Sequence, residues 1–427
     1  ALLFNHSEEF IVTVNAMWLT GVIPVLINTR NKAEEIEHQL QFTGTKILIT
    51  DTINYDKVNF LPFTRIFLFS EFQTQTKLEI NNTEFDPESV ALILFTSGST
   101  SKPKAVSHTF NNLYQSALLT NSVSSLSENN IWLASLPYYH IGGLMILVRA
   151  LVTGASLSVP LSTNYIHIKE SLIKFNPSHI SLVSTTLKQL LDEKVTPNSN
   201  LKCVYLGGGR LDTSLCKLAI GSGFPIIKVY GSTETCSMIA ALSVSDFSNK
   251  PESVGKPISN VIIKIISEHD EFLTAHNQSE IIIHSNTLMK EYYNNKEETS
   301  RKLKNGYYYT GDFGWIDNDG YLYIDVRRED LIVTGGENVN PKEVEQFLIQ
   351  LPSITDTFVF AEPDDKWGQI VCAVVVSNRN ITEDLLKEQL RNMMANYKVP
   401  KKIYFLDHIP RNELGKVEKQ KLIDSLR

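Results

Sequence analysis

The 427-residue sequence has few cysteines, and none of them are close together. The four cysteines are widely scattered, and no Cys-x-x-Cys pair occurs. This spacing does not support a zinc site or a thioredoxin-like redox motif. It is typical of buried free thiols in a reducing compartment, and no secretory signal opens the chain. We therefore expect a cytoplasmic protein. Because the chain begins with Ala1 rather than Met, we also expect that a further segment precedes it in the natural protein.

Long hydrophobic runs and an excess of basic charge are also missing. The most apolar stretches are residues 90–95 and residues 141–152, and the second is interrupted by Arg149 and two glycines. Neither approaches the roughly 20 apolar residues of a transmembrane helix. The net charge is −7 and the pI is about 5.9. A membrane span and a nucleic-acid partner are therefore not expected, while homo-oligomerisation stays open.

What the sequence does contain is a regular alternation of strand and helix patterns. Hydrophobic periodicity predicts helices at 8–20, 32–41 and 213–220, and strands at 22–27, 46–50, 90–95, 201–206 and 225–230. Strand, helix and strand in succession are typical of parallel sheets covered by helices. The predicted class is therefore α/β.

The sequence pattern changes near residue 253, where short β-rich runs begin. These runs occupy 261–266, 280–284, 307–309 and 321–326, and a charged tetrad, Arg-Arg-Glu-Asp, follows at 327–330. A helix starting at Pro341, strands at 357–361 and 370–376 and a helix at 383–397 then suggest a small α+β unit. We predict an N-terminal body at 1–326 with a β-rich subdomain at 253–326, a hinge at 327–330, and a C-terminal lid at 331–427.

The first motif with chemical content follows the apolar run at 90–95. It is rich in hydroxyls and lysine, and its candidate phosphate-binding residues are Thr96, Ser97, Gly98, Ser99, Thr100 and Lys104. Backbone N–H groups, hydroxyls and ammonium groups can hold a polyphosphate. The spacing is not that of the P-loop of NTPases. From these residues alone, a flexible surface loop is an equally good interpretation.

This segment resembles the phosphate-binding loop of the adenylate-forming superfamily, which includes acyl-CoA synthetases, luciferases and adenylation domains of peptide synthetases. Ser101 and Ala105 stand where that family usually has glycine, and Ser101 is expected to stiffen the loop. Further segments match the family's motifs in the same order across residues 90–420. Each one taken singly also fits an ordinary turn or a surface residue, but their common order favours the resemblance.

The resemblance implies Mg²⁺ as a cofactor and ATP and coenzyme A as co-substrates. It also assigns contacts to the nucleotide. Tyr230 is expected to stack on adenine, Thr233 to contact the α-phosphate, and Glu234 to hold Mg²⁺. The remaining candidates for ATP or AMP binding are Gly207, Gly208, Gly231, Asp312 and Arg327. Asp312 matches the residue that binds the ribose hydroxyls in the family.

The C-terminal region carries the rest of the implied machinery. Lys416 matches the family's catalytic lysine, and Glu329 falls at its hinge position. Gly335, Gly336 and Trp367 correspond to the region that shapes the tunnel for the pantetheine arm of coenzyme A. The implied reaction converts a carboxylate to an acyl-adenylate and then to an acyl-CoA.

The acyl pocket is the least specific part of the resemblance. His140 matches a histidine that borders this pocket in the family, and segments including 136–144 and 230–236 resemble the o-succinylbenzoate–CoA ligases of menaquinone biosynthesis. Such a dicarboxylate needs a cation or donors for its second carboxylate, and Arg149, Ser184 and Thr185 are the candidates. Arg149 equally fits a helix-surface arginine.

The alternatives for the function of the protein are another aryl- or acyl-CoA synthetase, an adenylation domain that loads a carrier protein, and a non-catalytic nucleotide sensor.

Overall fold

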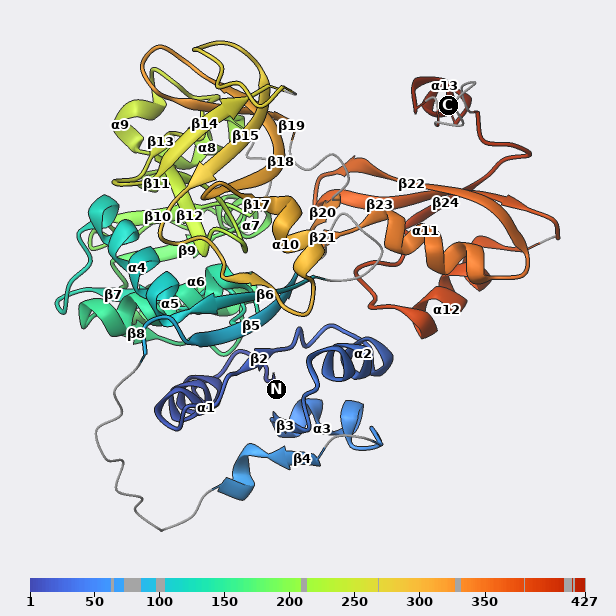
Figure 1. Cartoon of the computed structure of the whole chain (residues 1–427), viewed down its shortest axis with the longest axis horizontal. Helices are drawn as coiled ribbons and strands as arrows, with labels where there is room; N and C mark the ends of the chain where they lie inside the picture. The colour runs from blue at the N-terminus through green and yellow to red at the C-terminus, as the bar shows by residue number, and fades with distance from the viewer. Residues whose placement is uncertain are drawn as a thin grey trace. The chain divides into compact units, whose positions relative to one another are not determined.

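The computed structural model describes residues 1–62, 65–72, 86–96, 104–208, 213–267, 269–326, 332–379, 381–410, 417 and 419–426. The chain divides into two compact units (Figure 1). Unit 1 comprises Ala1–Thr29, Ile36–Thr96 and Lys104–Glu329. Unit 2 comprises Arg30–Glu35, Ser97–Pro103 and Asp330–Arg427.

The first sheet of unit 1 combines parallel strands with an antiparallel edge. In spatial order, its described strands are β16 (Glu291–Tyr292), β6 (Lys104–Thr109), β5 (Val90–Thr96), β2 (Val25–Leu26), β1 (Leu2–Leu3), β3 (Ile47–Thr50) and β4 (Arg65–Leu68). The pairs from β5 to β4 are parallel, whereas β6 runs antiparallel to both β5 and β16. The strand predicted at 22–27 is confined to β2, because Pro24 cannot donate a backbone hydrogen bond to a neighbouring strand.

The second sheet of unit 1 has the same mixed character. Its described strands, in spatial order, are β13 (Lys256–Pro257), β12 (Ser237–Leu242), β11 (Ile226–Ser232), β10 (Cys203–Leu206), β9 (His179–Leu182), β7 (Ile131–Leu133) and β8 (Ser156–Ser158). The strands from β11 to β8 are parallel, and β12 turns back antiparallel to β11. The carboxyl ends of β10 and β11 therefore lie at one edge, where open α/β sheets bind their ligands.

Helices accompany both sheets, and a smaller antiparallel sheet completes unit 1. The helices are α1 (Glu8–Leu19), α2 (Ala33–Thr43), α3 (Thr52–Val58), η1 (Phe69–Phe72), α4 (Phe110–Ser124), α5 (Ile141–Thr153), α6 (Tyr165–Phe175), α7 (Ser184–Asp192), α8 (Thr213–Gly221), α9 (Val244–Phe247) and α10 (Lys296–Lys302). The smaller sheet contains β14 (Ile262–Ile266), β15 (Ser279–His284), β17 (Leu303–Lys304), β18 (Tyr307–Ile316) and β19 (Leu322–Val326). Helices α4 and α5 pack against each other (Figure 1).

Unit 2 is an α+β unit with its own hydrophobic core. Its sheet contains β20 (Ile332–Thr334), β21 (Glu337–Val339), β22 (Ile354–Asp364), β23 (Gly368–Ser377) and β24 (Lys402–Phe405). Helices α11 (Pro341–Gln350), α12 (Glu383–Met393) and α13 (Lys419–Ser425) accompany it. Val344, Leu348 and Leu390 are fully buried in this core.

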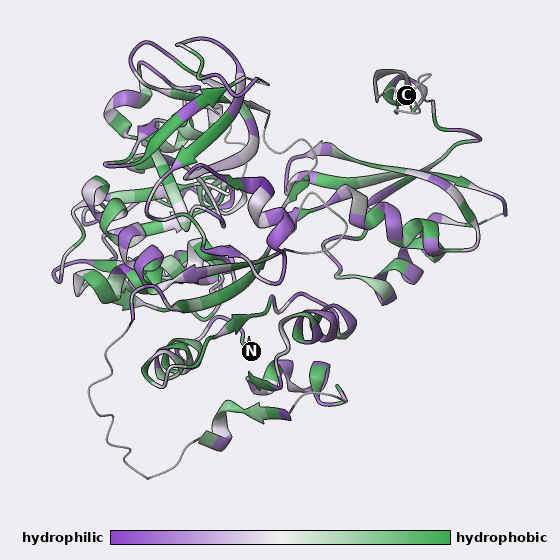
Figure 2. Cartoon of the chain, viewed as in Figure 1, coloured by the Kyte–Doolittle hydropathy of each residue, from purple (hydrophilic) through white to green (hydrophobic). Residues whose placement is uncertain are grey.

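The hydrophobic pattern explains why these elements form. Strand β15 and its neighbour β14 carry a continuous hydrophobic band in Figure 2, and the β15 isoleucines at 281, 282 and 283 are almost completely buried. Side-chain caps define helix starts. The Thr109 hydroxyl accepts a hydrogen bond from the Asn112 N–H, and Asn112 Oδ1 accepts one from the Thr109 N–H, which fixes the first turn of α4. The predicted α/β class is confirmed. Among the described residues, no helix is both long and apolar enough to cross a membrane.

Candidate active site

Tyr230 and Asp312 come together although 82 residues separate them. Tyr230 lies on β11 and Asp312 on β18, and the tyrosine hydroxyl donates a 2.6 Å hydrogen bond to Asp312 Oδ2. Both side chains are buried. The next residue, Gly231, has no room for a side chain, because a Cβ there would lie 1.9 Å from the Ser237 carbonyl oxygen. The contact holds the Asp312 carboxylate in one orientation beside the tyrosine.

The Thr233–Glu234 segment is held by two side chains that sequence reasoning did not select. Tyr292, on β16, donates a 2.8 Å hydrogen bond from its hydroxyl to Glu234 Oε1. His108, on β6, lies with its Nε2 2.8 Å from the Thr233 carbonyl oxygen. Because a carbonyl can only accept, this nitrogen carries the proton of the neutral ring. Burial lowers the pKa of His108 to about 4, so the ring is neutral near pH 7.

Two further segments, which the resemblance assigns to phosphate and adenine binding, lie at the ends of strands β5 and β10. Thr96 ends β5, and its buried hydroxyl has no hydrogen-bond partner within the described part of the chain. Lys104 begins β6 and forms an ion pair with Glu298. Ser97, Gly98, Ser99 and Thr100 lie outside the described residues. After β10, a Cβ on Gly207 would lie 2.8 Å from Val229 Cγ2, and Gly208 has a positive φ of 86°. Both positions therefore favour glycine.

Arg149 is not the helix-surface residue that the sequence left as an alternative. It lies on α5, its side chain is only 2% exposed, and its Nη2 donates a 2.9 Å hydrogen bond to Ser237 Oγ. The guanidinium carbon is 5.5 Å from the Trp132 ring centroid. No carboxylate among the described residues forms an ion pair with it. Burial lowers the pKa of Arg149 to about 10, which still leaves it charged near pH 7.

The other acyl-pocket candidates are closer to the surface than Arg149. His140 precedes α5 as its N-cap residue, with its ring at an edge-on distance of 4.8 Å from Tyr139. Ser184 and Thr185 occupy the first turn of α7 and are half-buried. Val183, just before this turn, approaches Gly208, since a Cβ on that glycine would lie 3.3 Å from Val183 Cγ1. Within the described part of the chain, Arg149 makes no hydrogen bond with Ser184 or Thr185.

The candidates for coenzyme A binding meet in unit 2. Gly335 and Gly336 form the tight turn between β20 and β21, both with positive φ, as a two-residue hairpin requires. The Gly335 N–H donates a 3.0 Å hydrogen bond to the Trp367 carbonyl. A Cβ on Gly335 would lie 2.7 Å from the Trp367 ring, so the backbone runs directly over the indole. Arg327, Glu329 and Lys416 lie outside the described residues.

The side chains around Glu234 suit a bound magnesium ion. Glu234 is a buried carboxylate, oriented by Tyr292, and Mg²⁺ typically binds one or two carboxylates together with substrate phosphates. Within the described ranges, no group of three or more His, Cys, Asp or Glu side chains is arranged to hold a metal ion. A single oriented carboxylate such as Glu234 fits an ion whose other ligands come from a bound polyphosphate and water.

Family models identify the class of protein that this fold and site belong to. A model described as AMP-binding enzyme matches residues 1–293, and one described as AMP-binding enzyme C-terminal domain matches residues 343–416. The chain belongs to this family, and the resemblance to adenylate-forming enzymes is confirmed.

Individual relatives narrow the comparison. The chain is 33% identical over 427 residues to a 2-succinylbenzoate–CoA ligase of Bacillus subtilis, covering 100% of this chain and 87% of the relative. The structure of a double mutant of o-succinylbenzoate CoA synthetase from Bacillus subtilis, bound with a product analogue, matches with a TM-score of 0.92 and 32% identity, covering 99% of this chain and 88% of that one. A structure of the Bacillus subtilis enzyme with ATP and magnesium matches with a TM-score of 0.72, 31% identity and the same coverage.

Proposed function

We propose that the protein is an ATP-dependent acid–CoA ligase that activates o-succinylbenzoate. In the first step a substrate carboxylate oxygen attacks the α-phosphorus of ATP, giving an acyl-adenylate and pyrophosphate. In the second step the coenzyme A thiol attacks the acyl carbon, giving an acyl-CoA and AMP. The family membership supports the chemistry, and the 2-succinylbenzoate–CoA ligases among the relatives support the acid.

The geometry of unit 1 supports the proposed roles in nucleotide binding. Tyr230 fixes the Asp312 carboxylate, whose remaining acceptor capacity suits the two ribose hydroxyls. Tyr292 fixes the Glu234 carboxylate, which would hold Mg²⁺, and the ion when bound neutralises phosphate charge. Lys104 would contribute an ammonium group to the phosphates. These residues bind and orient the nucleotide, so that the substrate carboxylate meets the α-phosphorus in line.

The remaining proposed roles, one in adenylation and the others in the transfer to coenzyme A, belong to unit 2 and to the segment before it. The turn at Gly335 and Gly336, packed on Trp367, leaves backbone without side chains where a thin pantetheine arm would pass. Lys416 is proposed to stabilise the charge that develops on the α-phosphate during adenylation. The hinge at 327–330 and the lid at 331–427 remain proposals, with Glu329 as the pivot.

The observation that carries the choice of acid is the buried Arg149. A buried cation is costly unless an anion or several acceptors compensate it. The Ser237 hydroxyl and the Trp132 ring supply part of this compensation, and no described carboxylate supplies the rest. A substrate with a second carboxylate would pair with this charge, whereas a fatty acid would leave it without an ionic partner. We therefore assign the non-reacting carboxylate of o-succinylbenzoate to Arg149.

The test compares acids in the wild type and in Arg149→Met, which keeps the side-chain length without the charge. We measure kcat/KM for o-succinylbenzoate, 2-propylbenzoate, benzoate and octanoate, with acyl-CoA formation as the readout. The wild type should prefer o-succinylbenzoate by about 10³-fold or more, since sites built to pair a polar group reject analogues that lack it. Arg149→Met should lose most of this preference while KM for ATP is retained. Ser237→Ala, which removes only the hydrogen bond, should show a smaller loss.

Each outcome separates one part of the proposal from the others. Equal use of octanoate or benzoate by the wild type would refute the assigned acid but not the ligase chemistry. A preference for o-succinylbenzoate that survives in Arg149→Met would support the acid and refute the role of Arg149. Transfer to a carrier protein in place of coenzyme A, or no pyrophosphate release with any acid, would refute the ligase.

A further inference from the structure

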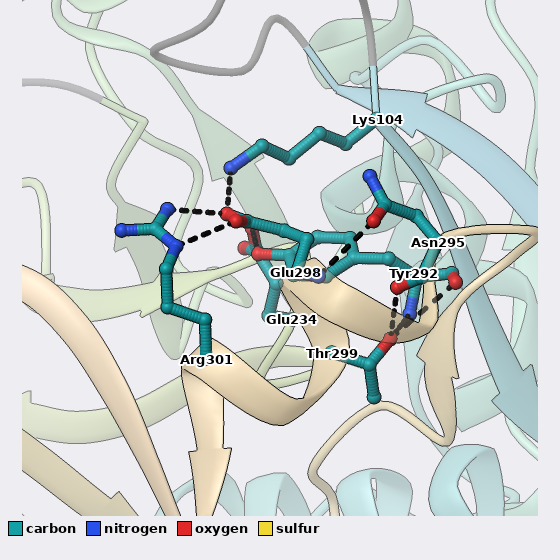
Figure 3. Close-up of polar contacts among 7 residues, drawn as sticks. All are labelled: Lys104, Glu234, Tyr292, Asn295, Glu298, Thr299 and Arg301. Atoms are coloured by element: carbon teal, nitrogen blue, oxygen red, sulfur yellow. Dashed lines mark hydrogen bonds and ion pairs between the residues drawn. The ribbon is translucent and has the colours of Figure 1, made fainter.

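Glu298 is shared by two cations at the edge of the nucleotide site (Figure 3). Arg301 binds it in a bidentate manner, with Nε 2.7 Å from Oε2 and Nη2 2.6 Å from Oε1. The Lys104 ammonium forms an ion pair with the same carboxylate. Glu298 and Arg301 lie on α10, whereas Lys104 begins β6, nearly 200 residues earlier in the chain.

The three side chains differ in burial, and this difference defines their roles. Lys104 and Glu298 are 9% and 11% exposed, but Arg301 is 56% exposed. Burial by itself raises the pKa of Glu298, but the hydrogen bonds from Arg301 and Lys104 outweigh it and lower the pKa to about 2. The carboxylate is therefore ionised near pH 7, and the three groups together carry one net positive charge.

Tyr292 connects this group to Glu234. The Lys104 ammonium lies 5.1 Å from the Tyr292 ring centroid, and the hydroxyl of the same tyrosine donates to Glu234. Helix α10 is fixed to β16, the strand that carries Tyr292. Asn295 Oδ1 accepts a 3.0 Å hydrogen bond from the Glu298 N–H, and Thr299 Oγ1 accepts a 3.0 Å hydrogen bond from the Tyr292 N–H. The position of Glu298 is thus tied to the strand that orients Glu234.

An ion pair between Glu298 and Arg301 three residues apart on a helix would by itself be an ordinary surface feature. Such pairs stabilise a helix by a few tenths of a kcal/mol. This explanation accounts for Arg301 but not for Lys104, whose ammonium is largely buried against the same carboxylate. Removing a partner from a carboxylate that is only 11% exposed is costly, and a bare Glu298 would also repel an incoming polyphosphate. Arg301 becomes necessary as a second cation if Lys104 has to leave Glu298 in order to bind the phosphates.

We propose that Glu298 and Arg301 are positioning residues that present Lys104 to the phosphates of ATP. Glu298 holds the ammonium beside Tyr292 before the nucleotide binds. Arg301 keeps the Glu298 carboxylate neutralised when Lys104 turns to the phosphates, so that the transfer does not leave this carboxylate unpaired. This inference rests on the proposed function, in which Lys104 contacts the phosphates. Neither Glu298 nor Arg301 is required to touch the reacting atoms.

The test is a double-mutant cycle on KM for Mg-ATP, measured by ATP–pyrophosphate exchange at saturating acid. Arg301→Met should raise KM by about 10-fold with little change in kcat, because Lys104 stays bound to an otherwise bare Glu298. Glu298→Gln alone, which no longer positions Lys104, should raise KM by a smaller factor than Arg301→Met. In the double variant it should relieve the competition for Lys104 and bring KM down to the level of Glu298→Gln, and Arg301→Lys should retain most of the affinity. Arg391→Met, at an exposed arginine on α12, is the matched control for losing one positive charge.

The outcomes distinguish this inference from the proposed function. If Lys104→Met leaves KM for Mg-ATP unchanged, the phosphate role of Lys104 fails. If Lys104→Met is impaired but Arg301→Met behaves like Arg391→Met, the role of Lys104 stands and the inference is wrong. A double variant that is no better than Arg301→Met would show that the pair only stabilises α10, which would also overturn the inference. Thermal melting of each variant verifies that it is folded.

Discussion

Acidification should destabilise the protein through two histidines, the buried His108 and His6, whose ring nitrogens are withdrawn from solvent. Burial lowers the pKa of His6 and of His108 to about 4, from an ordinary value of 6.5. Above about pH 6.5 both rings are neutral in the folded and in the unfolded chain, so they add no pH dependence. Between about pH 6.5 and 4 the unfolded chain binds protons that the folded chain does not bind. The free energy of unfolding therefore falls as the pH falls through this window.

The magnitude follows from the gap between the two pKa values. A gap from 6.5 to about 4 corresponds to about 3 kcal/mol per histidine once the pH has reached 4, and to about 1 kcal/mol at pH 5.5. Replacing His108 by Gln removes the titrating ring but keeps an N–H donor for the Thr233 carbonyl. Carboxylates remote from His108 titrate equally in both proteins, so the difference between the two proteins reports His108 together with its electrostatic interaction with Glu234.

The assay is urea unfolding of wild type and His108→Gln at about pH 7.5 and about pH 5.5, with the midpoint converted to free energy. The loss of stability between the two pH values should be about 1 kcal/mol smaller in the variant. Lys217→Gln, at an exposed position on α8, controls for a substitution that leaves the ring in place. An identical pH dependence of His108→Gln and wild type would refute the assignment of a depressed pKa to His108.

Two further variants test the site directly. Tyr292→Phe removes the hydrogen bond to Glu234 without changing the ring, and it should raise the Mg²⁺ concentration needed for half-maximal ATP–pyrophosphate exchange by about 5- to 10-fold; an unchanged Mg²⁺ dependence would argue against Glu234 as the ligand. Lys416→Ala should lose on the order of 10²-fold in adenylation but retain thioester formation from supplied acyl-adenylate, and equal loss in both half-reactions would contradict its assigned role.

The fold class was predictable because the parallel strands are local in sequence. Strands β9, β10 and β11 follow one another with helices between them, and hydrophobic periodicity reports such units directly. The edge of the first sheet was not predictable in this way. The hydroxyl-rich pattern predicts a loop that includes Lys104, but Lys104 begins β6, which pairs with β16 at residues 291–292. No local pattern indicates a pairing over that distance.

The same reasoning explains which site residues were found. Tyr230, Glu234 and Asp312 stand in short motifs, whereas Tyr292 and Glu298 become neighbours of the site only through the β6–β16 pairing. The burial of Arg149 did leave a signal in the sequence. Its helix is apolar on nearly all sides, and a helix of that kind is mostly buried, as α5 is up to Ala150. The apolar surroundings of Arg149 in the sequence therefore favoured a buried position over the helix-surface alternative.

The β6–β16 pairing also limits how the chain can be cut. Strand β16 belongs by sequence to the β-rich region, but it forms the edge of the first sheet, and the Met289 N–H donates to the Glu234 carbonyl at 2.7 Å. A fragment ending near residue 252 would lose that edge strand and expose the hydrogen-bonding groups of β6. Such a fragment should aggregate when expressed alone and recover when co-expressed with the remainder, so a split-enzyme reporter built on this chain needs its break point after residue 293.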